Sequence, residues 1–266
     1  MVMVMGEKER PPAAFLFDLD GTLYTEAGPI PGAVEALAEL RRRGVPFRCV
    51  TNTTRRCRRL LAERLAGYGF AMEPAEIVTA VMSGVGLLRS RGLTRVAAYV
   101  APETLEDFAV FDLAGARPEA VVVGDLGDAW NFERLNQAFH QLMDGADLLA
   151  LQRDRYWLKG DALALDAGPF VAALEYATGK TATVCGKPSA AFYRAALATL
   201  PAAIAARPRD VLMVGDDLWG DVEGAQQAGL RAWMVRTGKF RDDVVAASGI
   251  TPERVIDSVA DLPGLF

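Results

Sequence analysis

The sequence AAFLFDLDGT at residues 13–22 joins five apolar residues to a pair of aspartates. An apolar run of this length predicts a buried strand, and Asp18 and Asp20 stand where that strand would end. Because side chains alternate between the two faces of a strand, both carboxylates are expected on one side at its carboxyl end, the edge where open parallel sheets bind ligands. Unpaired charges beside an apolar strand are costly, so the pair predicts a bound cation, a shared proton or both. Mg2+, a hard cation that prefers oxygen ligands, fits best.

The pair Asp18 and Asp20 also allows two other interpretations. The spacing excludes an EF-hand calcium loop, which counted from Asp18 needs Gly at the sixth position and Glu at the twelfth, where the chain has Leu23 and Pro29. A plain surface turn stays open for this segment taken alone, since Asp and Gly are common turn residues.

A second apolar run, VPFRCV at residues 45–50, leads into Thr51 and Asn52 and then into an arginine-rich helical pattern. Hydroxyl, amide and backbone N–H groups at a helix start form an anion site, and Thr51 and Asn52 are the better ligand candidates because they lie nearest the strand end. For Thr53 and Thr54, a plain helix N-cap and a phosphate contact stay equally open.

Two later apolar runs also end in residues that carry chemistry. TVC at residues 183–185 comes shortly before Lys187, which is either a phosphate-binding cation or a solvated surface charge. DVLMV at residues 210–214 precedes a cluster of three acids, Asp216, Asp217 and Asp221. Acids gathered directly after a buried strand indicate metal binding.

The order of these four segments, which together span nearly the whole chain, resembles the motifs of the haloacid dehalogenase superfamily, whose members are mostly phosphohydrolases. Residues 18–22 look like its first motif, Thr51 and Asn52 its second, Lys187 its third, and the acids from Asp216 onward its fourth. Further stretches are similar to subclass IIA, which holds the NagD-type and nitrophenyl phosphatases and a branch of HDHD-type hydrolases and phospholysine/phosphohistidine inorganic pyrophosphate phosphatases. These stretches are residues 49–54, 173–178, 186–188 and 237–240.

The resemblance implies a Mg2+-dependent phosphohydrolase that acts on a small phosphorylated metabolite through an aspartyl-phosphate intermediate. Asp18 would be the nucleophile that attacks phosphorus. Asp20 would protonate the leaving oxygen and then deprotonate the attacking water. Mg2+ would be held by Asp18, by the backbone carbonyl of Asp20 and by Asp216.

The resemblance also implies how the phosphoryl group is held. Thr51, Asn52 and Lys187 would bind its oxygens, which suits a reaction in which positioning and charge neutralisation supply most of the catalysis. Asp217 or Asp221 would complete the surroundings of the metal or orient Lys187, and the sequence does not choose between the two acids.

Two other functions would use parts of the same residue set. A phosphotransferase would form the same intermediate and pass the phosphoryl group to another acceptor. A non-catalytic receiver-like module would be phosphorylated on aspartate as a signal. It needs neither Asp20 as an acid nor a large inserted domain, so it ranks last.

The distance between the second and third segments predicts a second domain, because about 135 residues separate Thr51 from Lys187 and a strand with its crossover helix needs about 30. We expect an α/β fold with a doubly wound parallel sheet at residues 1–80 and 180–266. The insertion at residues 81–179 is expected to be α/β, and the resemblance identifies it as a C2-type cap. Its predicted strands and helices lie at residues 95–100, 120–124, 147–151, 132–143 and 169–178.

The loop QRDRYW at residues 152–157 is the candidate for substrate selection within this cap. Gln152 and Arg153 are suited to hydrogen-bond a polar leaving group, and Tyr156 is suited to stack on a ring. An ordinary amphipathic loop is an equally open interpretation. Phosphatases of the resembled subclass often carry Asn and Asp in this region, and the departure of QRDRYW from that pattern argues against pyridoxal-phosphate specificity.

Composition restricts the partners of the chain. Its 266 residues are 51% hydrophobic and its net charge is −5, so it can bury a sizeable core and lacks the basic footprint of a nucleic-acid binder. The three cysteines have no metal-binding spacing and are expected to be reduced core thiols of a cytosolic protein.

The N-terminal segment, residues 1–10, is too short and too acidic for a signal peptide, and no apolar stretch of about 18 residues follows. We therefore expect a cytoplasmic protein that acts on a small-molecule phosphate and binds neither nucleic acid nor membrane. A homodimer stays open, because dimerisation through the cap is common among the resembled proteins.

Overall fold

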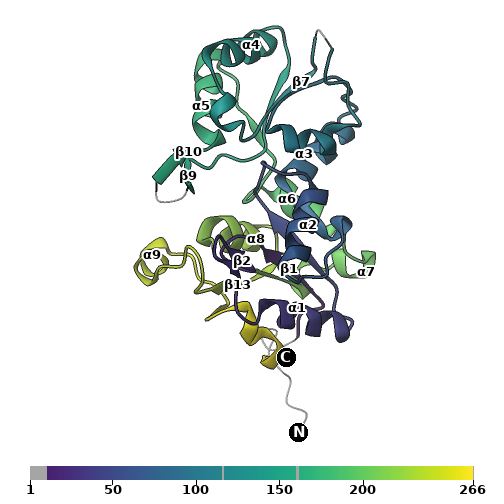
Figure 1. The fold of residues 1–266 in the computed structure, drawn as a ribbon, viewed down its shortest axis with the longest axis vertical. Helices are drawn as coiled ribbons and strands as arrows, with labels where there is room; N and C mark the ends of the chain where they lie inside the picture. The colour runs from purple at the N-terminus through teal and green to yellow at the C-terminus, as the bar shows by residue number, and fades with distance from the viewer. Residues whose placement is uncertain (1–10, 116, 160–161, 266) are drawn as a thin grey trace. The chain divides into compact units, whose positions relative to one another are not determined.

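The computed structural model describes residues 11–115, 117–159 and 162–265, so the N-terminal segment considered above for a signal peptide lies outside the described residues. The chain forms two compact units, which we call unit 1 and unit 2 (Figure 1). Unit 1 takes residues 1–51, 62–78 and 193–266, and unit 2 takes residues 52–61 and 79–192. The role of the insertion as a substrate-selecting cap stays a prediction.

Unit 1 is built on a six-stranded sheet with the order β14-β13-β12-β1-β4-β5. Its centre is β1 (Ala14–Asp18), in which all five residues are buried. This strand pairs in parallel with β4 (Phe47–Thr51) on one side and β12 (Val211–Gly215) on the other. Because parallel strands point the same way, all three end at one edge of the sheet, as the sequence predicts for Asp18.

The helix α1 (Ala33–Arg42) shows why the elements around this sheet form. Its buried residues follow the three- and four-residue spacing of one helical face, and they are Ala33, Ala36, Leu37 and Leu40. The other elements of unit 1, including two helices that continue into unit 2, are β2 (Tyr24–Thr25), β3 (Gly28–Pro29), α2 (Arg58–Gly67), η2 (Pro74–Glu76), β5 (Ile77–Thr79), α6 (Ala190–Leu197), α7 (Ala202–Ala205), η5 (Pro208–Asp210), η6 (Leu218–Glu223), α8 (Gly224–Gln227), β13 (Arg231–Val235), α9 (Asp242–Ser248), β14 (Arg254–Ile256) and η7 (Val259–Gly264).

Unit 2 has its own four-stranded parallel sheet with the order β11-β8-β7-β6, which confirms the second α/β fold. Its strand β7 packs both faces: Ala120 and Val122 join one apolar cluster, and Val121 and Val123 join the other. Figure 1 shows α3 on one face of this sheet and α4 with α5 on the other. The elements are α3 (Ala80–Ser90), β6 (Val96–Tyr99), η3 (Pro102–Phe108), β7 (Ala120–Val123), η4 (Gly127–Ala129), α4 (Phe132–Met143), β8 (Asp147–Ala150), β9 (Tyr156–Lys159), β10 (Ala162–Leu165), α5 (Ala167–Thr178) and β11 (Thr183–Val184).

The predicted elements of the insertion agree closely with those observed. The helix expected at 132–143 has those bounds, while α5 begins at Ala167 rather than at Pro169. The earlier start has a local cause, because the carboxylate of Asp166 accepts the Ala167 N–H at 2.7 Å and so caps the helix.

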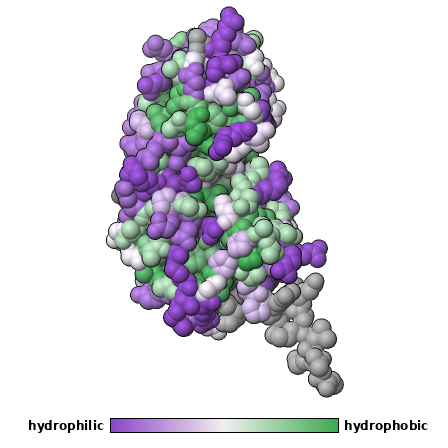
Figure 2. All heavy atoms as spheres, turned by 90° about the vertical axis from the view of Figure 1, so that its right-hand side faces the viewer, coloured by the Kyte–Doolittle hydropathy of each residue, from purple (hydrophilic) through white to green (hydrophobic). Residues whose placement is uncertain are grey.

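The surface and the cysteines complete this description. On the face drawn in Figure 2, hydrophobic and hydrophilic residues are interspersed. The cysteines Cys49, Cys57 and Cys185 are buried and unbonded to one another, and burial raises the pKa of each thiol, which makes them poor nucleophiles. Among the described residues, no helix has the length and apolar character needed to cross a bilayer.

Candidate active site

Three buried aspartates of unit 1 form an acidic cluster. Asp18 ends β1, Asp216 follows β12 directly, and Asp221 lies in η6. Each offers a carboxylate oxygen, and these oxygens all lie within 4.8 Å of one another. The first and fourth sequence segments therefore converge at the carboxyl edge of the unit 1 sheet.

The environment of this cluster disfavours three simultaneous negative charges. Burial, together with the charges of Asp18 and Asp221, raises the pKa of Asp216 to about 8, although a hydrogen bond from the Lys239 backbone N–H acts in the opposite sense. A bound cation would remove this repulsion. The donor set consists of carboxylate oxygens alone, which fits a hard divalent cation such as Mg2+.

Two glycines let the neighbouring loops approach Asp216 closely. Gly21 has φ +83° and Gly238 has φ +71°, and a Cβ at either position would overlap the Asp216 carboxylate. The loop after Gly238 also holds that carboxylate, because the Lys239 N–H donates to Asp216 Oδ2 at 2.8 Å. The position of Asp216 is thus fixed by backbone on both sides.

Asp18 and Asp20 lie in different environments even though only one residue separates them. Asp18 is buried, and the Thr22 hydroxyl points to its Oδ2 at 3.4 Å. Asp20 is exposed, and its Oδ2 accepts a hydrogen bond from the Tyr24 hydroxyl at 3.2 Å. Burial and the charge of Asp20 raise the pKa of Tyr24, so this phenol remains a donor. The two carboxylates are therefore suited to two different roles.

The structure separates Asp217 from Asp221, which the sequence left as alternatives. Asp221 is fully buried in the acidic cluster, and its Oδ2 accepts the Asp217 N–H at 3.1 Å. The Asp217 side chain instead caps η6 by accepting the N–H groups of Trp219 and Gly220 at 3.1 and 2.8 Å. Of these two acids, Asp221 is therefore the one whose carboxylate belongs to the acidic cluster.

Lys239 is a site residue that the sequence argument did not single out. Its Nζ forms an ion pair with Asp217 Oδ2 at 2.7 Å. Lys239 is exposed, and the negative charges of Asp217, Asp216 and Asp18 raise its pKa. The available signal was the stretch at residues 237–240, which follows β13 and was used above only to place the subclass.

The predicted phosphate-binding residues divide between the two units. Thr51 is buried at the end of β4 in unit 1. Asn52 and Lys187 belong to unit 2, where Asn52 Oδ1 accepts the Lys187 N–H at 2.7 Å and Asn52 Nδ2 donates to the Lys187 carbonyl at 3.1 Å. The Lys187 side chain is buried.

The N-cap interpretation of Thr53 and Thr54 is wrong, because α2 begins only at Arg58. Thr54 instead bonds to other residues of unit 2. Its hydroxyl accepts the Asp125 N–H at 2.9 Å, and its carbonyl accepts a hydrogen bond from the Thr104 hydroxyl at 2.7 Å.

The three predicted specificity residues have different surroundings. Gln152 is buried and bonds through its side chain to the Asp166 carboxylate and the Asp154 N–H, so it holds its own loop in place. Arg153 pairs with Glu175 at 2.8 Å. Tyr156 is 59% exposed, which leaves its ring accessible.

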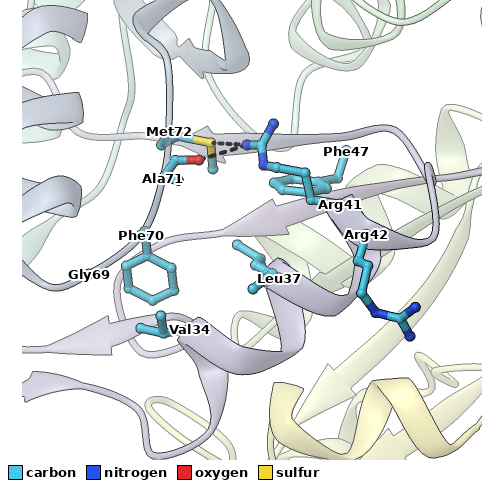
Figure 3. Close-up of a pocket in the computed structure, with 10 residues that line it drawn as sticks. Val34, Leu37, Arg41, Arg42, Phe47, Gly69, Phe70, Ala71 and Met72 are labelled. Carbon is cyan, nitrogen blue, oxygen red and sulfur yellow. Dashed lines mark hydrogen bonds between the residues drawn. The ribbon is translucent and has the colours of Figure 1, made fainter.

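A separate cavity of about 300 Å³ lies in unit 1, and most of the residues that line it are apolar (Figure 3). It is bordered by α1, by residues 69–72 and by Phe47, which starts β4 and so lies at the opposite strand end from Thr51. Arg41 crosses it and donates to the Ala71 carbonyl at 2.7 Å. Among the described residues that line this cavity there is no aspartate or glutamate, so the acidic cluster is the stronger candidate for catalysis.

Comparisons with known proteins identify the family of the chain. A family model described as haloacid dehalogenase-like hydrolase matches residues 15–113, and a second, HAD-hydrolase-like, matches residues 184–262. The human haloacid dehalogenase-like hydrolase domain-containing protein 2 is 42% identical over 86% of this chain and 85% of its own. The rat phospholysine phosphohistidine inorganic pyrophosphate phosphatase is 35% identical over 94% of this chain and 93% of its own.

Solved structures show the same fold. The 4-nitrophenylphosphatase of Thermotoga maritima superimposes with a TM-score of 0.88 at 23% identity, covering 98% of this chain and 99% of that one. The glycerol phosphate phosphatase of Mycobacterium tuberculosis, solved in complex with calcium, has a TM-score of 0.81 at 30% identity and covers 94% of this chain and 74% of that one.

Proposed function

Because this chain belongs to the haloacid dehalogenase-like hydrolases, in the subclass of the NagD-type and nitrophenyl phosphatases, we propose that it is a Mg2+-dependent phosphohydrolase of a small phosphorylated metabolite that works through an aspartyl-phosphate. The observation that carries this proposal is the buried cluster of Asp18, Asp216 and Asp221 at the carboxyl edge of the unit 1 sheet. Relatives that match most of this chain are named phosphatases, which favours turnover over a receiver-like role.

Asp18 is the proposed nucleophile. Its carboxylate attacks phosphorus while the bond from phosphorus to the leaving oxygen breaks, and the product is an acyl phosphate on Asp18. Its buried position shields the attacking oxygen from competing water, and the Thr22 hydroxyl at 3.4 Å helps to orient it.

Asp20 is the proposed general acid and base. It gives its proton to the leaving oxygen, and it then takes a proton from the water that attacks the acyl phosphate and frees Asp18. Its exposed carboxylate can exchange protons with solvent, while the hydrogen bond from the Tyr24 hydroxyl holds one of its oxygens.

Asp18, Asp216 and the backbone carbonyl of Asp20 would hold Mg2+, with Asp221 as the further acid beside it. When bound, the ion supplies positive charge that offsets the negative charge of the phosphoryl group and of the nucleophile. Lys239 supports this arrangement, because its backbone N–H orients Asp216 while its ammonium group balances Asp217.

The remaining roles are proposals that rest on the family motifs. Thr51 and Lys187 would bind phosphoryl oxygens by a hydroxyl and an ammonium group. The substrate is proposed to be a small phosphate ester or anhydride, since relatives are named for glycerol phosphate and for inorganic pyrophosphate. Transfer to a second acceptor, a homodimer and a cytoplasmic location stay predictions.

The test is phosphate release from p-nitrophenyl phosphate by the full chain, with Mg2+ and with EDTA. We expect turnover that requires Mg2+ and is lost in both Asp18→Asn and Asp20→Asn. Asp147→Asn, an exposed aspartate at the start of β8, is the control and should keep full activity. Turnover that survives EDTA or either of the first two substitutions would contradict the proposal.

A further inference from the structure

Asn52 and Lys187 are joined by a reciprocal pair of hydrogen bonds across 135 sequence positions. From this geometry we propose that Asn52 is a positioning residue, whose side-chain amide fixes the backbone of Lys187 and does not itself bind the phosphoryl group. The proposal rests on the proposed phosphate-binding role of Lys187. It replaces the sequence-based expectation that the Asn52 amide is a phosphate ligand.

The geometry of the pair uses both ends of one amide. Asn52 Oδ1 accepts the Lys187 N–H at 2.7 Å, and Asn52 Nδ2 donates to the Lys187 carbonyl at 3.1 Å. Only one orientation of the amide satisfies both bonds, because a flipped amide would face N–H to N–H and oxygen to oxygen. Both ends of the side chain are thus engaged with the Lys187 backbone, which leaves one Nδ2 hydrogen for another partner, and the variants below test whether it reaches the phosphoryl group.

Gly186 shows that this close approach is built into the chain. A Cβ at Gly186 would overlap Asn52 Oδ1, and it would also lie 2.6 Å from the Leu151 carbonyl oxygen and 3.1 Å from the Ala80 Cβ. The φ of Gly186 is not positive, so this glycine is required for space rather than for backbone conformation. The residue before Lys187 is therefore pressed against both Asn52 and the end of β8.

The consequence for catalysis follows from the length of a lysine side chain. Its ammonium group is held in one position only if the backbone that carries it is fixed. Lys187 is buried, with 6% of its surface exposed. The pairing of β11 (Thr183–Val184) with β8 reaches Cys185, whose N–H donates to the Ala150 carbonyl at 2.8 Å, two residues before Lys187. The Asn52 amide bonds to the backbone N–H and carbonyl of Lys187 itself, and so fixes the residue that carries the ammonium group.

The test is a set of four variants assayed with p-nitrophenyl phosphate and Mg2+: Asn52→Ala, Asn52→Asp, Lys187→Ala and the double variant Asn52→Ala/Lys187→Ala. We expect Asn52→Ala to lower kcat/KM by about 10- to 100-fold through misplacement of Lys187. The double variant should be no slower than Lys187→Ala by more than about twofold, since both changes remove the same interaction. If the loss of kcat/KM in the double variant equals the product of the losses in the two single variants, the proposal is overturned.

Asn52→Asp separates positioning from phosphate binding. A carboxylate keeps the shorter bond, the acceptor for the Lys187 N–H, but loses the donor to the Lys187 carbonyl, so the proposed role predicts a partly retained clamp and a rate between those of wild type and Asn52→Ala. An Asn52 that touched the phosphoryl group would give the opposite order, because a carboxylate there would repel the phosphate and be worse than alanine. Asn136→Ala is the matched control in unit 2, because it truncates an exposed asparagine in the same way.

A second measurement does not depend on activity. Hydrogen exchange of the Lys187 amide should be slow in wild type, intermediate in Asn52→Asp and fast in Asn52→Ala. Equal exchange in all three would overturn the proposed clamp even if the kinetics agreed. If wild type hydrolyses no phosphomonoester, the proposed function fails, and the exchange rates still decide whether Asn52 holds Lys187.

Discussion

The acidic cluster of unit 1 and the Asn52–Lys187 pair of unit 2 are held together by opposite means. The cluster brings three like charges into a buried space, and burial with mutual repulsion raises the pKa of Asp216 to about 8. The Asn52–Lys187 pair is closed by two hydrogen bonds between a neutral amide and backbone. The cluster therefore needs a proton or a cation to be complete, whereas the pair is complete without either.

The largest expected effect separates activity from stability within the cluster. Asp18→Asn should lower kcat on the order of 10³-fold or more, because the amide cannot form the acyl phosphate. The same change removes one of three repelling charges, so the Tm measured in EDTA should rise rather than fall. Steady-state kinetics and thermal unfolding check the two results, and a fall in the EDTA Tm would contradict the account of the cluster as strained by charge.

Gly238→Ala tests whether close backbone approach fixes Asp216. The added Cβ would overlap the Asp216 carboxylate at φ +71°, so we expect a loss of about 2 kcal/mol or more in the free energy of unfolding together with weaker Mg2+ binding. Gly249→Ala is the matched control, since its φ is +75° and no atom lies within 4 Å of its Cβ position. Denaturant unfolding of both variants measures the difference, and equal losses would show that backbone strain alone is responsible.

Asp221→Asn and Asp217→Asn compare the two acids that the sequence could not rank. Removing the charge of Asp221 from the cluster should weaken Mg2+ affinity by about 10- to 100-fold. Asp217→Asn should leave that affinity within a few-fold, because the Asp217 side chain caps η6 and pairs with Lys239. Calorimetric titration with Mg2+ distinguishes the variants, and the reverse ranking would contradict the assignment.

The smallest expected effect is a pH dependence of Mg2+ stabilisation. The pKa of Asp216 rises from 3.8 to about 8 on folding without metal, so the folded state binds more protons and its stability falls as pH rises through this range. Mg2+ must displace that proton, so the Tm increase it causes should grow from about pH 5 to about pH 8. Asn52→Ala should show the same growth, because its bonds carry no charge. A Tm increase independent of pH would contradict the prediction.

The sequence predicted the parts of the site that depend on strand direction. Asp18 and Asp216 converge because β1 and β12 are parallel neighbours, and apolar runs with polar ends are enough to infer that. The difference between Asp217 and Asp221 depends on the turn geometry of η6, which no residue pattern specified. The role of the Asn52 amide depends on a contact across 135 positions, and only folding brings those residues together.

The most direct test of the central claim, that Asp18 becomes phosphorylated during turnover, is to trap the intermediate. The enzyme is mixed with p-nitrophenyl phosphate and Mg2+, quenched in acid and reduced with borohydride, which converts an aspartyl-phosphate to homoserine. Peptide mass spectrometry should then find homoserine at position 18 in wild type and none in Asp18→Asn. Active wild-type enzyme with no label at position 18, or with the label on Asp20 or Asp216, would contradict the account.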